Sequence, residues 1–70
     1  MSAFSVRLRE LRASKNVTQK QIAESIGLSE RAYQYYELAE REPTVGTINK
    51  LADFFEVSTD YLLGRTNNPK

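Results

Sequence analysis

The chain has 70 residues and a formal net charge of +1 at pH 7, and it contains neither cysteine nor histidine. Such a length supports one domain with a small core, which depends on good helix packing or on oligomerisation. Without cysteine and histidine, disulfides, thiolate or imidazole metal sites and Ser-His or Cys-His catalysis are excluded, so we expect no metal and no other cofactor. No apolar run approaches the roughly 20 residues of a membrane helix and no signal-peptide pattern is present, so we expect a cytoplasmic protein that binds no membrane.

The first predicted helix runs from about Phe4 to Lys15. Phe4, Leu8 and Leu11 stand at i, i+4 and i+7, the spacing of a buried stripe on one side of a helix. Asn16 suits the end of this helix.

The second predicted helix starts at Thr18. Thr18 and Gln21 form a Thr-x-x-Gln pattern, the capping box that satisfies free backbone N–H groups at a helix start. Gly27 ends the helix, because glycine enters the left-handed conformation at little steric cost. The apolar residues between these ends fall on one side at helical spacing: Ile22, Ala23 and Ile26.

The third predicted helix follows after a very short connection, because Ser29 can cap a helix two residues beyond Gly27. Residues 18–37 therefore have the layout of a helix-turn-helix, in which the second helix enters the major groove of DNA.

The rest of the chain adds a loop and two more helices. Residues 38–43 form the loop, which ends at Pro43, and a fourth helix starts near Thr44. Ser58 can cap a fifth helix that contains residues 61–63 and stops at Gly64. The fourth helix shows the clearest apolar stripe of the chain: Ile48, Leu51, Ala52 and Phe55. The predicted fold is all-α, a compact bundle of five short helices over residues 1–64 with a polar, frayed tail over residues 65–70.

Several segments together resemble the phage-repressor-like (Xre-type) helix-turn-helix family over nearly the whole chain. The matching pieces are RLRELR (7–12), TQKQIAESIGLS (18–29), YYE (35–37), REP (41–43) and LADFFEVSTDYLLG (51–64). The resemblance implies a five-helix lambda-repressor-like domain that binds DNA and represses transcription. The residues themselves argue against an enzyme, because the chain has no pair of nucleophile and base.

The resemblance also implies roles for five residues. Ala23 is the small residue where the second and third helices cross, and Gly27 is the turn glycine. Gln19 matches the glutamine that contacts a backbone phosphate and braces the recognition helix. Arg12 and Glu37 match a structural ion pair that joins the first helix to the third.

The third helix presents two faces. Tyr33 and Tyr36 fall on the core side, with their hydroxyls expected at the surface. On the other side arginine can bond guanine, glutamine can bond adenine and glutamate can accept from cytosine. Glu30 can equally serve only to stabilise the helix N-terminus. The expected base-reading residues are Arg31 first, then Gln34 and Tyr35, with Glu30 and the preceding Ser29.

Phosphate contacts are expected at the starts of the second and third helices, where backbone N–H groups point outward. The side chains placed to help are Thr18, Gln19, Lys20, Ser29 and Arg41. The chain departs from the family in the loop, where Leu38, Ala39 and Glu40 replace the usual glycine and basic residue. We expect this change to lengthen the third helix or alter the loop path, and to make the affinity for DNA modest and strongly salt-dependent.

The family binds palindromic operators as a two-fold dimer, with half-sites about 10 bp apart, so we expect a homodimer on double-stranded DNA. The candidates for the dimer interface are Phe54, Val57, Tyr61, Leu62 and Leu63. At least one of Leu62 and Leu63 is expected to close the core of the monomer instead.

The distribution of charge leaves a second function open. Residues 1–20 carry five basic side chains and one acidic one, whereas residues 21–42 carry two basic and five acidic ones. An acidic third helix and the missing basic loop residue also suit a protein-interaction module on the same fold, such as an antitoxin or a partner-docking regulator.

Overall fold

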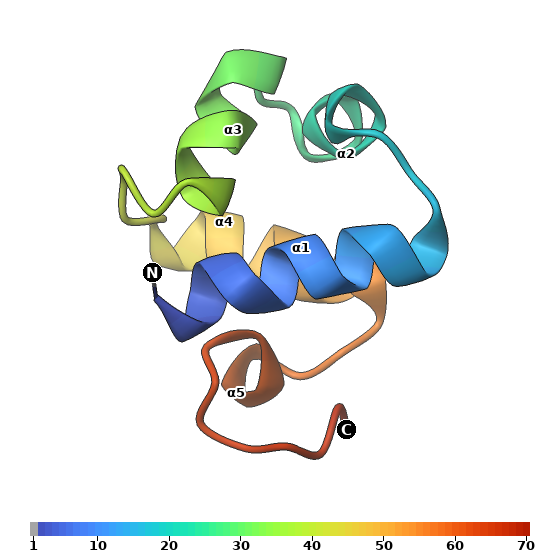
Figure 1. The fold of residues 1–70 in the computed structure, drawn as a ribbon, viewed down its shortest axis with the longest axis vertical. Coiled ribbons are helices and arrows are strands. Elements are labelled where there is room, and N and C mark those ends of the chain that lie inside the picture. The colour runs from blue at the N-terminus through green and yellow to red at the C-terminus, as the bar shows by residue number, and fades with distance from the viewer. Residues whose placement is uncertain (1) are drawn as a thin grey trace.

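Five helices form the regular structure of residues 2–70, the part of the chain that the computed structural model describes (Figure 1). They are α1 (Ala3–Lys15), α2 (Gln19–Ile26), α3 (Glu30–Glu37), α4 (Val45–Phe55) and α5 (Thr59–Leu62). Met1, the first residue of the expected domain, lies outside the described residues. The all-α prediction is confirmed. The fifth helix is one residue shorter than predicted, because Leu63 is its C-cap and Gly64 follows in a left-handed conformation.

Each helix begins after a serine or threonine whose hydroxyl oxygen accepts a hydrogen bond from the backbone N–H three residues later. These N-caps are Ser2, Thr18, Ser29, Thr44 and Ser58. At Thr18 the capping box is complete, since Gln21 Oε1 in turn accepts from the Thr18 N–H at 2.8 Å. Each such cap contributes about 1 kcal/mol, so the helix starts are specified locally.

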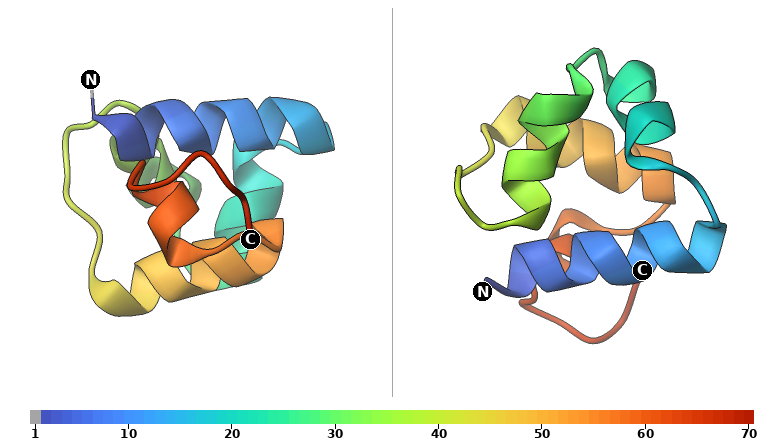
Figure 2. Two further views of the ribbon diagram at one scale, coloured as in Figure 1. Left: turned by 90° about the horizontal axis from the view of Figure 1, so that it is seen from below. Right: turned by 45° about the horizontal axis from the view of Figure 1, so that its top comes forward.

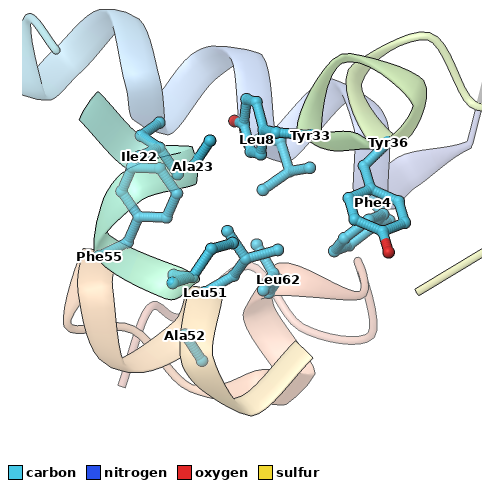
Figure 3. Packing of buried hydrophobic residues seen from close by; sticks show 11 residues of the cluster. Phe4, Leu8, Ile22, Ala23, Tyr33, Tyr36, Leu51, Ala52, Phe55 and Leu62 are labelled. Atoms are coloured by element: carbon cyan, nitrogen blue, oxygen red, sulfur yellow. The ribbon is translucent and has the colours of Figure 1, made fainter. Parts of the chain in front are cut away.

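One apolar core lies between the helices (Figure 3). Leu8 of α1, Ile22 of α2, Leu51 of α4 and Leu62 of α5 have no solvent-exposed surface. Tyr33 of α3 is equally buried, and Phe4 meets Tyr36 edge to face with ring centroids 6.3 Å apart. The core thus draws on all five helices, and Leu11 only borders it.

The helix-turn-helix pair lies on one side of α1, and α5 lies on the other side with the C-terminal tail (Figures 1 and 2). The expectation of a frayed tail is wrong. Arg7 Nη2 donates to Asn67 Oδ1 at 2.9 Å, and the Ser58 N–H donates to the Pro69 carbonyl at 2.8 Å. The tail is therefore folded back onto α1 and the start of α5.

Candidate nucleic-acid interface

The connection between α2 and α3 is a tight turn. Gly27 adopts φ +76°, and the Leu28 N–H donates to the Ala23 carbonyl at 2.9 Å, which closes the end of α2. Ala23 is buried in the core, and α2 and α3 pack directly against each other. The turn leaves the first residues of α3 exposed to solvent.

The predicted base-reading residues share the outward face of α3, although they differ in exposure. Glu30 and Arg31 are exposed, whereas Gln34 and Tyr35 are half-buried. The hydroxyl of Ser29 already accepts from the Ala32 N–H at 3.1 Å, so its first role is to cap the helix.

A chain of hydrogen bonds runs from α1 through α2 to this face. Arg12 Nε and Nη2 donate to the two carboxylate oxygens of Glu37, at 2.7 and 3.1 Å. Gln19 Nε2 donates to Glu37 Oε1 at 3.1 Å, and Gln19 Oε1 accepts from Gln34 Nε2 at 3.1 Å. The orientation of the Gln34 amide is therefore set by Gln19, which Glu37 and Arg12 hold in turn.

This chain of hydrogen bonds favours the charged form of Glu37. Burial disfavours its carboxylate, but hydrogen bonds from Arg12 and Gln19 outweigh burial and lower the pKa of Glu37 below its usual value. The Tyr33 hydroxyl makes no hydrogen bond among residues 2–70, and it is buried rather than at the surface as predicted. Burial raises the pKa of Tyr33, which lies close enough to Glu37 and Arg12 to be influenced by their charges.

A second group of side chains extends across the surface of α3. Arg31 Nε donates to Tyr35 Oη at 3.2 Å, and the guanidinium carbon of Arg41 lies 4.7 Å from the centre of the Tyr35 ring. The hydrogen bond to Tyr35 raises the pKa of Arg31, so its guanidinium is charged under all ordinary conditions. The structure thus brings two cations together at one tyrosine.

The loop after α3 turns sharply at Ala39. Ala39 adopts φ +59°, its N–H donates to the Tyr36 carbonyl at 3.2 Å, and the Glu40 N–H donates to the Tyr35 carbonyl at 2.9 Å. This is the Schellman ending, for which helices usually use glycine. Of the two expected alternatives, a longer third helix or an altered loop path, the first is wrong, because alanine takes the left-handed position and α3 ends at Glu37.

Similarity to known proteins decides the family. A family model described as helix-turn-helix matches residues 8–62. The chain belongs to the helix-turn-helix family of transcriptional regulators. It is 40% identical over 66 residues to the HTH-type transcriptional regulator YobD of Bacillus subtilis, which covers 94% of this chain and 59% of YobD. It is 44% identical over 59 residues to the cryptic phage CTXphi transcriptional repressor RstR of Vibrio cholerae, which covers 84% of this chain and 53% of RstR.

A solved structure gives the same fold. The P22 c2 repressor in complex with synthetic operator 9T superposes with a TM-score of 0.82 at 28% identity, over 86% of this chain and 91% of the repressor chain. The chain spans only a little over half the length of the curated relatives it matches.

The residues predicted to contact phosphates lie at three places, one of which is Ser29, the N-cap of α3. Gln19 is half-buried and Lys20 is exposed in the first turn of α2, directly after Thr18. Arg41 is exposed in the loop and leans over Tyr35, next to the end of α3. The structure therefore brings Arg41 to the base-reading face, which its distance in sequence from Arg31 does not reveal.

The five predicted interface residues do not form one exposed surface. Leu62 is fully buried in the monomer, so its assignment to a dimer interface needs correction, and Leu63 is 37% exposed. Phe54 and Val57 are half-buried against the core. The guanidinium carbon of Arg7 lies 3.9 Å from the centre of the Tyr61 ring and covers it.

The prediction overlooked two exposed apolar side chains near the loop. Leu38 is 57% exposed at the C-cap of α3, and Val45 is 74% exposed at the start of α4. The signal for Leu38 was present, because it stands in the loop where the chain departs from the family. Within residues 2–70, no helix is long and apolar enough to cross a membrane.

Proposed function

We propose that this chain binds double-stranded DNA in a sequence-specific manner as a two-fold dimer, and that it represses transcription in the cytoplasm. The observation that carries the proposal is the outward face of α3, where Arg31 is exposed and Gln34 is fixed by Gln19. In the proposed complex this face lies in the major groove. The operator complex of the similar P22 c2 repressor supports this docking.

The two fixed side chains suit different bases. Arg31 can donate two hydrogen bonds to O6 and N7 of guanine, and Gln34 can pair with an adenine edge. Glu30 stands at the first position of α3, where it stabilises the helix N-terminus and can reject bases that offer only acceptors. Lys20, Gln19 and Arg41 would contact phosphates beside the groove.

A dimer is part of the proposal because one small domain gives little specific affinity. The longest dimension of the protomer is 28 Å, which is shorter than the spacing of about 34 Å between successive major grooves. Two protomers can therefore lie side by side on one face of a palindromic operator. Leu63 is the most exposed of the four remaining interface candidates, which also include Phe54, Val57 and Tyr61.

The test is selection of bound duplexes from a random pool, with the mass of the complex measured alongside. We expect a palindrome bound by two protomers. Arg31→Ala should lose roughly 1–3 kcal/mol of discrimination at one base pair of each half-site. Lys50→Ala, which also removes an exposed cation but from α4, is the control and should keep the preference.

Two outcomes of this selection would contradict different parts of the proposal. If no duplex is selected even at low salt, the proposed function is wrong, and the protein-interaction module becomes the better account of the acidic residues 21–42. If duplexes are selected but Arg31→Ala leaves the preference unchanged, only the reading face is wrong.

A further inference from the structure

Tyr35 is the meeting point of two exposed arginines. Its hydroxyl accepts a hydrogen bond from Arg31 Nε at 3.2 Å, while the guanidinium of Arg41 lies over the ring with its carbon 4.7 Å from the centre. The hydroxyl and the ring face are different parts of the side chain, so both contacts exist at once. Tyr35 itself is half-buried between them.

The contact with Arg31 selects one edge of its guanidinium. Because Nε–H points at Tyr35, the pair of terminal NH₂ groups is the edge left to form a two-bond contact with a base. Arg31 and Tyr35 stand at i and i+4, so the helix itself keeps them adjacent. A long side chain that is already held loses less conformational freedom when it binds.

The contact with Arg41 depends on the loop. The Glu40 N–H donates to the Tyr35 carbonyl, and the left-handed Ala39 reverses the chain, which returns Arg41 to the ring of Tyr35. A guanidinium over an aromatic face is attracted by the ring electrons. This contact keeps a cation at the end of α3, although the neighbouring Glu40 and Glu42 are acidic.

We propose that Tyr35 is a positioning residue for both arginines and not itself a reader of bases: its hydroxyl orients Arg31 for a base, and its ring holds Arg41 for a phosphate. This inference rests on the proposed DNA-binding function. The inference gives the hydroxyl and the ring of Tyr35 different roles, so one substitution that removes only the hydroxyl and one that also removes the ring can test the two roles separately.

The experiment uses the duplex selected by the unmodified protein and compares Tyr35→Phe with Tyr35→Leu. Tyr35→Phe keeps the ring but removes the hydroxyl. It should reduce discrimination at the base pair read by Arg31 by about three- to tenfold, the range expected for one exposed hydrogen bond, and leave the salt dependence unchanged. Tyr35→Leu removes the ring as well. It should in addition weaken binding to all duplexes and lower the salt slope by about 1 per protomer, the same effect that we expect of Arg41→Ala.

Double variants show whether Tyr35 acts through the arginines. Adding Tyr35→Phe to Arg31→Ala should cause no further loss of base discrimination, because the residue it positions is gone. The matched control is Tyr36→Phe, the same chemical change one residue along α3 at a side chain buried against Phe4. This control should keep both the base preference and the salt slope.

Two outcomes would overturn the inference while leaving DNA binding intact. Unchanged base preference in Tyr35→Phe would show that the hydroxyl does not orient Arg31. An additive loss in the double variant would show that Tyr35 contacts DNA directly. Failure of the unmodified protein to select any duplex would instead count against the proposed function.

Discussion

Gly64 and Gly27 have nearly the same backbone conformation but very different surroundings. Both adopt left-handed φ values, +78° and +76°. A Cβ on Gly27 would meet nothing within 4 Å, whereas a Cβ on Gly64 would clash with the Cβ of Ala3. Gly64 therefore serves two purposes at once, the turn after α5 and the close approach of that turn to α1.

This difference gives a matched pair of substitutions. Gly27→Ala should lower the free energy of unfolding by about 1 kcal/mol, the strain of a left-handed alanine. Gly64→Ala should cost clearly more, because the chain must also move away from Ala3. Urea unfolding measures both. Measured in an Ala3→Gly background, which already includes the cost of a glycine in α1, Gly64→Ala should cost about as much as Gly27→Ala. A cost that stays as high as in the unmodified protein would place the strain elsewhere.

Residue-level features were predictable from the sequence where they are local. The N-caps at Thr18, Ser29 and Ser58 follow from a hydroxyl and a backbone N–H three residues later. The sequence alone could not show which of Leu62 and Leu63 is buried. Adjacent helix positions point about 100° apart, and the docking of α5 decides which of the two side chains enters the core.

At the scale of elements, the end of α3 contains a non-glycine residue in a left-handed conformation, which lowers the stability of the fold. Ala39 occupies the left-handed position of a Schellman ending. From the local sequence one could expect the missing glycine to change this turn. One could not foresee that the same turn forms with alanine in the left-handed position. The hydrogen bonds of the Ala39 and Glu40 N–H groups offset the strain, and the contact of Arg41 with Tyr35 follows from this turn rather than from any spacing in the sequence.

Ala39→Gly should therefore stabilise the protein. We expect the free energy of unfolding to rise by about 0.5–1 kcal/mol, since glycine removes the left-handed strain but has a more flexible unfolded state. Ala13→Gly is the control: the same substitution in the exposed last part of α1 should lower stability by about 1 kcal/mol. Chemical denaturation of both variants checks the sign, and a destabilised Ala39→Gly would contradict the account of the turn.

At the scale of the whole molecule, Glu37 joins three helices. Arg12 reaches it from α1 and Gln19 from α2, and Glu37 as a whole is only 3% exposed on α3. The resemblance implied the pair with Arg12, whereas the extension through Gln19 to Gln34 depends on how α2 and α3 cross. Because one carboxylate accepts from both neighbours, its protonation should loosen the helix-turn-helix and its attachment to α1 together.

Acid should therefore destabilise the fold through Glu37. Its pKa is below the usual 4.5, because hydrogen bonds from Arg12 and Gln19 outweigh the opposing effect of burial. A carboxyl group whose pKa falls on folding stabilises the folded state above its unfolded pKa, and this contribution is lost as pH falls through the folded value. We expect this contribution to be constant from pH 7 to about pH 5 and to decrease below the unfolded pKa of 4.5.

Two variants isolate this contribution in urea titrations between pH 7 and pH 3. Glu37→Gln leaves Arg12 without its charged partner, so it should lose about 3 kcal/mol at pH 7 but show a shallower decrease in acid. Glu24→Gln, which neutralises an exposed carboxylate on α2, should keep the full decrease. If Glu37→Gln declines as steeply as the unmodified protein, the acid sensitivity belongs to other carboxylates, and Glu37 is not the charge that holds α1, α2 and α3 together.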